Sequence, residues 1–183
     1  MTPVTDLLAA AQSGDVQAVD KLFAALYEEL HRIAHLQLRR NAPVTLLDTT
    51  SLVHESFLRL LKAGSLKPSD RAHFLGYSAR AMRSIVVDAV RRRMTERRGG
   101  NLVHLDVDAA RDVAHNPGED EIMRVNDALN ELARVDERLV RVVEMRYFAG
   151  MQEQEVADAL GVSVRTVARD WEKARLFLAA TIR

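Results

Sequence analysis

Three hydroxyl side chains, Thr49, Thr50 and Ser51, stand in a row where an amphipathic helix is expected to begin. This helix is predicted from about Thr50 to Lys62, because apolar residues recur there at helical spacing. A hydroxyl at Thr50 or Ser51 is well placed to accept a backbone N–H and cap the helix. It can equally accept a phosphoryl group, which adds a charge of about −1.5 to −2 at neutral pH. Both interpretations stay open.

A second group of side chains that could do chemistry consists of His31, His35 and Glu28. They share a helix face at a spacing that can bind a metal. No further ligand is well placed, the chain has no cysteine, and it has neither an HExxH motif nor a glycine-rich phosphate loop. The sequence therefore predicts no metal site, no cofactor and no enzymatic activity.

A strongly basic segment runs from Arg80 to Arg98, with seven arginines against only Asp88 and Glu96. The aromatic residue Tyr77 precedes it, and a basic helix with nearby aromatics suits a single nucleic-acid strand. Taken alone, this segment is more typical of an ordinary amphipathic helix with a solvated arginine face. The whole chain has zero net charge, which argues against a uniformly basic nucleic-acid binder.

The segment from Gln152 to Leu178 has the pattern of a helix-turn-helix. A first helix is expected to end at Leu160, Gly161 suits a tight turn, and Ser163 suits the cap of a second helix. That second helix would lie in the major groove of DNA. A plain helical hairpin is the alternative. The residues predicted to contact DNA are Ser163, Val164, Arg165, Thr166, Arg169 and Lys173, with Asp170 expected to be exposed among them.

The elements that must position these residues are predicted to be helices throughout. The chain has 183 residues, 48% of them hydrophobic and only 5% aromatic, which favours helices over sheets. Helical patterns run over about 6–13, 16–40, 50–62 and 71–93, and resume at 119. We predict an all-α protein with two small helical domains, 1–98 and 119–183, joined by a flexible linker over 99–118. No secretion signal or membrane-spanning segment is evident, so we expect a cytoplasmic protein.

The order of these parts resembles bacterial RNA polymerase sigma factors of the extracytoplasmic-function (ECF) class. The segment 52–60, LVHESFLRL, looks like the core-polymerase-binding helix of that family. The segment 85–93, IVVDAVRRR, looks like the end of its promoter-melting helix, and residues 155–167 resemble its final helix-turn-helix. The resemblance covers nearly the whole chain.

The resemblance implies two partners, core RNA polymerase and promoter DNA. The domain 1–98 would bind the clamp helices of the large polymerase subunit and the minus-ten element, and 119–183 would read the minus-thirty-five element. The implied polymerase contacts are Asp48, Thr50, Ser51, Leu52, Glu55 and Phe57. The implied minus-ten contacts are Tyr77, Arg80, Arg83, Ser84, Arg91 and Arg92.

Two departures from the family pattern bear on function. Ser84 stands where the family often has asparagine, which leaves the promoter preference open. Thr50 and Ser51 stand at two positions that are usually acidic. A missing partner at a desolvated charge pair can cost about 2–5 kcal/mol of affinity. Phosphorylation of Thr50, Thr49 or Ser51 by a Ser/Thr protein kinase would restore the charge, which makes a phosphorylation switch a hypothesis of equal standing with simple caps.

Two other classes of function remain as alternatives. A stand-alone helix-turn-helix regulator would bind a palindromic DNA site as a dimer, without polymerase. An adaptor would use its first domain to bind a protein partner and would not bind DNA. Transcription by core polymerase separates the sigma factor from both, and DNA binding without polymerase separates the two alternatives.

Overall fold

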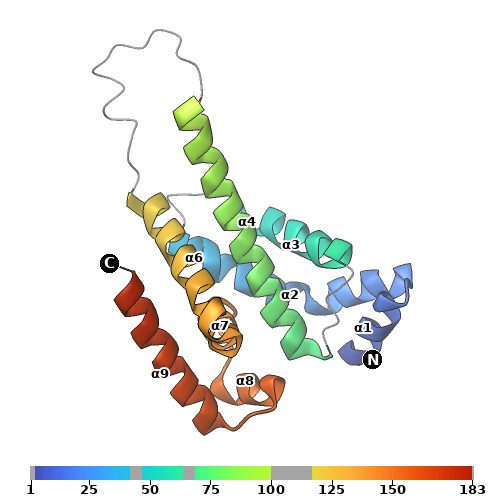
Figure 1. Cartoon of the computed structure of the whole chain (residues 1–183). Helices are drawn as coiled ribbons and strands as arrows, with labels where there is room; N and C mark the ends of the chain where they lie inside the picture. Colours follow the sequence, from blue (N-terminus) through green and yellow to red (C-terminus); the bar gives the residue numbers. More distant parts are fainter. Residues whose placement is uncertain (1–2, 42–46, 64–68, 100–116, 183) are drawn as a thin grey trace.

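The computed structural model describes residues 3–41, 47–63, 69–99 and 117–182. Over these residues it is helical and contains no strand, which confirms the all-α prediction (Figure 1). None of its helices is long and apolar enough to cross a membrane within those ranges. In chain order the elements are α1 (Val4–Gln12), α2 (Val16–Asn41), α3 (Thr49–Ala63), α4 (Arg71–Gly99), α6 (Pro117–Val135), α7 (Glu137–Val143), the π-helical turn η1 (Glu144–Phe148), α8 (Glu153–Leu160) and α9 (Val164–Thr181).

The first half of the molecule, α1 to α4, is organised around one apolar stripe on α2. Leu22, Leu26, Leu30 and Ile33 recur every three or four residues and are all buried, so they form a single face of the helix. The helices α1, α3 and α4 each pack against α2, and α3 also packs against α4. Burial of such a stripe supplies most of the stability of a helix in water, since isolated helices are marginal.

The long helix α4 is the central element of the fold. In Figure 1 α3 lies on one side of α4 and α6 and α7 lie on the other, while α2 passes behind it. It continues to Gly99, beyond the end predicted at Arg93. The predicted linker 99–118 falls almost entirely on residues 100–116, which lie outside the described part of the chain.

The second half, α6 to α9, contains two elements that the sequence analysis did not predict separately, α7 and η1. Asp136 caps α7 because its side chain accepts the backbone N–H of Arg138 at 2.9 Å. The helix then widens into η1, where the N–H of Ala149 reaches the carbonyl of Glu144, five residues earlier, at 2.9 Å. Such π-helical turns are rare and are often found at functional sites. Here η1 carries Glu144 toward α4.

The helix-turn-helix is confirmed in its local geometry. The helix α8 ends at Leu160, and Gly161 takes the left-handed conformation with φ 64° and ψ 35°. Ser163 then caps α9, its hydroxyl accepting the N–H of Thr166 at 3.2 Å. The buried side chains of Val156 and Val167 lie between the two helices.

Replacing Ser163 with alanine is expected to lower the free energy of unfolding by about 1 kcal/mol, because the cap is lost. Urea unfolding measures this change directly. Thr181 offers a matched control, because its hydroxyl bonds the carbonyl of Phe177 at the far end of the same helix. An equal loss in Ser163→Ala and Thr181→Ala would contradict the assigned cap.

Candidate functional site

The start of α3 is capped by Asp48, and not by Thr50 or Ser51 as the sequence suggested. Asp48 Oδ1 accepts the backbone N–H of Ser51 at 2.9 Å, and Oδ2 accepts the Ser51 hydroxyl at 2.6 Å. The Ser51 hydroxyl, together with that N–H, holds the pKa of Asp48 below its usual range. The helix begins at Thr49, one residue before the predicted start. The prediction that Thr50 or Ser51 caps the helix is therefore wrong. The helix starts at Thr49, so Asp48 takes the cap position.

The two faces of α3 differ from the predicted assignment of polymerase contacts. Leu52 and Phe57 are buried against the rest of the first half, so they hold the helix in place and present no surface to a partner. The outer face carries Thr50 and Glu55 as expected. It also carries two leucines that the sequence analysis missed: Leu58 is 53% exposed and Leu61 is 41% exposed.

A single arginine joins this face of α3 to the basic helix α4. Arg59 Nη1 donates to Ser84 Oγ at 3.2 Å and to Asp88 Oδ2 at 3.1 Å. Its other terminal nitrogen lies 3.5 Å from Glu55 Oε1. Ser84 is thus placed next to a fixed cation, and a predicted polymerase contact is linked to a predicted DNA contact.

The basic residues predicted for the minus-ten element lie in two environments. Arg91 and Arg92 are exposed near the end of α4. Arg83 is enclosed, with only 12% of its side chain exposed, and donates to Asn126 Oδ1 at 2.7 Å and to Glu144 Oε1 at 3.2 Å. Arg80 lies 3.8 Å from the same Glu144 oxygen. The fold therefore leaves α4 exposed at Arg91 and Arg92 and covers it at Arg83.

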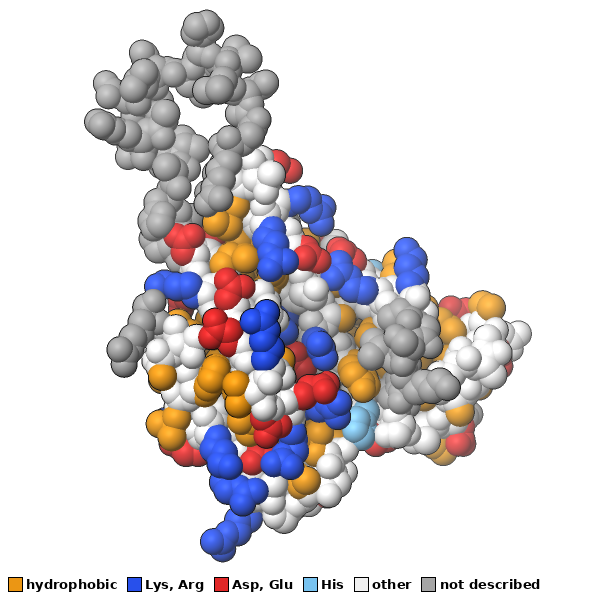
Figure 2. All heavy atoms as spheres, viewed as in Figure 1, with side chains coloured by type: hydrophobic (Ala, Val, Ile, Leu, Met, Phe, Trp, Pro, Cys, Tyr) orange, Lys and Arg blue, Asp and Glu red, His pale blue; other side chains and the backbone are white. Residues whose placement is uncertain are grey.

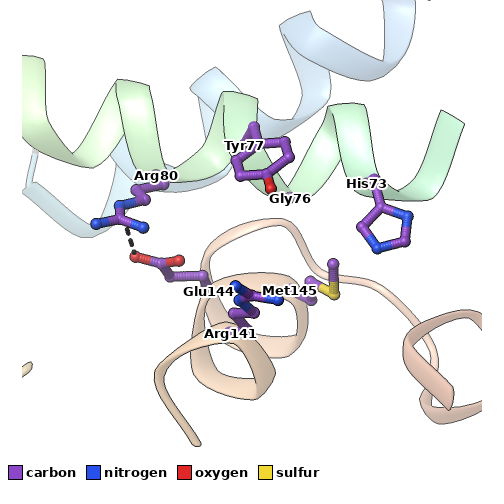
Figure 3. Close-up of a pocket in the computed structure, with 7 residues that line it drawn as sticks. All are labelled: His73, Gly76, Tyr77, Arg80, Arg141, Glu144 and Met145. Atoms are coloured by element: carbon purple, nitrogen blue, oxygen red, sulfur yellow. Dashed lines mark ion pairs between the residues drawn. The ribbon is translucent and has the colours of Figure 1, made fainter. Parts of the chain in front are cut away.

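The buried carboxylate of Glu144 lies at the centre of this contact. Figure 3 shows it between Arg80 of α4 and Arg141 of α7, at the edge of a small hollow that Tyr77 and His73 also line. Burial raises the pKa of Glu144, and the nearby arginines act in the opposite direction. The hollow holds about 20 Å³, far less than the space an organic ligand occupies.

The start of α9 presents the predicted DNA-contacting side chains to solvent. Arg165, Arg169 and Lys173 are exposed, and Figure 2 shows lysine and arginine side chains at this end of the molecule. Asp170 is not exposed as expected: it is 0% exposed, and Arg138 Nε donates to its Oδ2 at 2.7 Å. Asp170 therefore anchors α9 to α7. Ser163 is exposed, while Val164 and Thr166 are half-buried at the same turn.

The two histidines of α2, His31 and His35, do not form part of a metal site. The rings of His31 and Tyr27 lie next to each other, tilted by 34°, with their centroids 5.8 Å apart. Across the described ranges, no three histidine or acidic side chains gather in a way that could hold a metal ion.

A helical fold with a capped helix-turn-helix and exposed arginines at the start of its second helix is typical of helical DNA-binding proteins. The comparisons make this more specific, because the family model described as ECF sigma factor matches residues 1–183. The chain belongs to the ECF sigma factor family. Proteins of this family are not enzymes; they bind core RNA polymerase and promoter DNA and direct transcription initiation.

The solved structure of CnrH in complex with the cytosolic domain of CnrY matches with 24% sequence identity and a TM-score of 0.43, covering 96% of this chain and 94% of that one. The search of curated proteins gave no match.

Proposed function

We propose that this sigma factor binds core polymerase through the outer face of α3 and promoter DNA through α4 and the start of α9. The observation that carries the proposal is the division of α3 into a buried face and an outer face with two uncovered leucines, Leu58 and Leu61. Apolar side chains on an otherwise polar helix face are typical of protein interfaces. The domain 1–98 serves the polymerase and the minus-ten element, and 119–183 serves the minus-thirty-five element.

The polymerase-binding face is proposed to be switched on by phosphorylation, with Thr50 as the best acceptor. Thr50 is exposed in the first turn of α3, whereas Thr49 is half-buried. The Ser51 hydroxyl already donates to Asp48, so a phosphate there would break the cap and lie against a carboxylate. A phosphate on Thr50 keeps the cap and adds negative charge at the positive end of the helix dipole.

Without phosphorylation, the outer face of α3 has fewer acidic residues than the family pattern. A phosphate on this face would therefore supply the negative charge that the sequence lacks. The first turn of α3 contains no acidic residue. A phosphate supplies a charge of about −1.5 to −2 and three acceptor oxygens, which pair well with arginine or lysine. A Ser/Thr protein kinase would then be a regulatory partner of this chain.

Affinity for core polymerase tests this proposal. The unmodified chain, the chain phosphorylated at Thr50 and the Thr50→Ala variant would be titrated with core polymerase, with mass spectrometry to confirm the site. Restoring one desolvated charge pair is expected to tighten binding by at least about thirtyfold. Transcription from a promoter would rise in parallel.

Other results would change the proposal in defined ways. Tight binding and active transcription by the unmodified chain would contradict the phosphorylation switch. They would still agree with the proposed polymerase-binding and DNA-binding surfaces. A gain on phosphorylation of Ser51→Ala equal to that of wild type would confirm that Ser51 is not the acceptor. No binding and no transcription in either state would contradict the proposed surfaces.

A further inference from the structure

Asp170 places a carboxylate on the buried face of α9, the second helix of the helix-turn-helix. Its neighbours on that face, Val167 one turn earlier and Ala174 one turn later, are apolar and 0% exposed, as Asp170 itself is. The helix α9 packs against α7, which runs beside it in Figure 1. A buried carboxylate costs free energy unless its oxygens find donors, and an apolar residue would avoid that cost. The charge of Asp170 therefore needs an explanation beyond packing.

The two oxygens of this carboxylate have different surroundings. Oδ2 accepts a hydrogen bond from Arg138 Nε of α7 at 2.7 Å, and this contact fixes the orientation of the carboxylate. Oδ1 is also buried, but it accepts no hydrogen bond from any described residue. Arg169 Nε lies 3.8 Å from Oδ1, at ion-pair distance and just beyond hydrogen-bond distance. A small rotation of the exposed Arg169 side chain therefore brings its Nε–H to the remaining acceptor of Asp170.

A contact through Nε leaves the outer end of Arg169 available to DNA. An arginine carries five N–H donors in a planar fork, one on Nε and two on each terminal nitrogen. The Arg169 side chain is 61% exposed, so it projects from α9 although its Nε lies near a buried carboxylate. In the major groove guanine presents two acceptors, N7 and O6, which an arginine can contact together. A side chain that is already held in position loses less conformational entropy when it makes this contact.

Other contacts also hold α9 in place, so its position does not depend on the charge of Asp170 alone. The Trp171 ring packs against Arg146 of η1, whose guanidinium carbon lies 4.6 Å from the ring centroid. Arg146 in turn pairs with Glu153 of α8 at 2.9 Å. A substitution that removes the charge of Asp170 but keeps its shape should therefore leave α9 packed on α7 and release Arg169.

We propose that Asp170 is a positioning residue for reading the minus-thirty-five element. Its buried carboxylate, oriented by Arg138, holds Arg169 through Nε so that the terminal nitrogens of Arg169 contact a guanine. This role rests on the proposed contact between the start of α9 and that element. It adds the base that Arg169 reads and the residue that aims Arg169 at it. Asp170 itself touches no DNA.

Side-chain NMR of the free, full-length chain tests the contact between Asp170 and Arg169. The order parameter of the Arg169 Nε–H bond reports how firmly this side chain is held. Asp170→Asn keeps the shape and removes the charge, so it should lower this order parameter. Arg138→Gln breaks the same ion pair with α7 but keeps the charge of Asp170, so Arg169 should stay restricted. An Arg169 that is as mobile in the wild type as in Asp170→Asn would overturn the inference.

The base preference of transcription tests what the contact does. The Thr50-phosphorylated chain and core polymerase would transcribe a promoter library that is randomised at the minus-thirty-five element, with a barcode in each transcript. Arg169→Ala should lose a preference for guanine at one position by about fivefold or more, because one bidentate contact is removed. Asp170→Asn should weaken the preference at that position alone, and Arg138→Gln should keep it. In the Arg169→Ala background, Asp170→Asn should have no further effect, because Asp170 acts through Arg169.

A purely structural role of Asp170 would give a different pattern. Asp170→Asn would then weaken the preference at every position, or its effect would multiply with that of Arg169→Ala, and either result overturns the inference. A preference for another base at the Arg169 position would contradict the assigned guanine contact. If Arg169→Ala changes no base preference, the proposed DNA contact of this residue is wrong and the positioning role is wrong with it. If the chain never transcribes, phosphorylated or not, the proposed function is contradicted, while the NMR measurement still decides whether Asp170 holds Arg169.

Discussion

Replacing Arg165 and Arg169 with alanine together should lower transcription from a promoter with a matched minus-thirty-five element by about a hundredfold. Each exposed arginine that contacts a base edge contributes about 1–3 kcal/mol of discrimination. Arg165 and Arg169 lie four residues apart at the start of α9 and are both exposed, so both can enter the major groove. The loss of transcription should be large on the promoter with the matched minus-thirty-five element and small on a promoter that lacks this element.

The measurement is single-round transcription by the Thr50-phosphorylated chain with core polymerase, on two promoters that differ only in the minus-thirty-five element. Arg134→Ala provides the control, because Arg134 is an exposed arginine on α6, outside the helix-turn-helix. Unfolding curves would show whether the double variant keeps its stability, as expected for exposed side chains. A uniform loss on both promoters would mean that these arginines contact only phosphates or the polymerase.

The parts that the sequence predicted well are those decided by neighbours in the chain. Gly161 and Ser163 mark the turn of the helix-turn-helix, because a left-handed residue and a cap depend on only a few positions. The bounds of α1, α2 and α3 were predicted to within two residues for the same reason, whereas α4 extends to Gly99, well beyond its predicted end at Arg93. The start of α3 was placed one residue late, which was enough to assign its cap to a hydroxyl and to overlook Asp48.

The parts that the sequence could not predict depend on residues that are distant along the chain. Asp170 has an acidic side chain on a recognition helix and was expected to be exposed, but its partner Arg138 lies 32 residues earlier. Arg83 was predicted to face DNA, and its partner Glu144 lies 61 residues later in a π-helical turn that no local pattern marks. Such pairings follow from the way the two halves pack.

The burial of α3 shows a further limit of periodicity. Four leucines and one phenylalanine recur at close spacing along this segment, so the sequence pattern alone does not decide which of them face inward. Only the positions of α2 and α4 decide that Leu52 and Phe57 point inward while Leu58 and Leu61 point outward. The resemblance to sigma factors assigned polymerase contacts to this helix, but it included the buried Leu52 and Phe57 and left out the exposed Leu58 and Leu61.

This correction leads to a contrast between two leucines of the same helix. Leu58→Asp should weaken binding to core polymerase by about thirtyfold or more, since truncation or charge at a central interface residue costs 2 kcal/mol or more. Its effect on folding should be small, because Leu58 is exposed. Leu52→Ala should lower the free energy of unfolding by about 2–5 kcal/mol, because Leu52 is fully buried and its loss leaves a cavity.

Binding and stability must be measured on the same preparations, by titration with core polymerase and by urea unfolding. Thr50-phosphorylated chain should be used in both, so that a weak starting affinity does not hide the loss. A third variant, Val135→Asp, introduces the same charge at an exposed apolar position outside α3 and should change neither quantity. If Leu58→Asp binds polymerase as wild type does while Leu52→Ala loses binding at full stability, the outer face of α3 is not the contact surface. The opposite pattern would establish that the polymerase binds the leucines that the fold leaves uncovered, while the buried leucines only hold the helix in place.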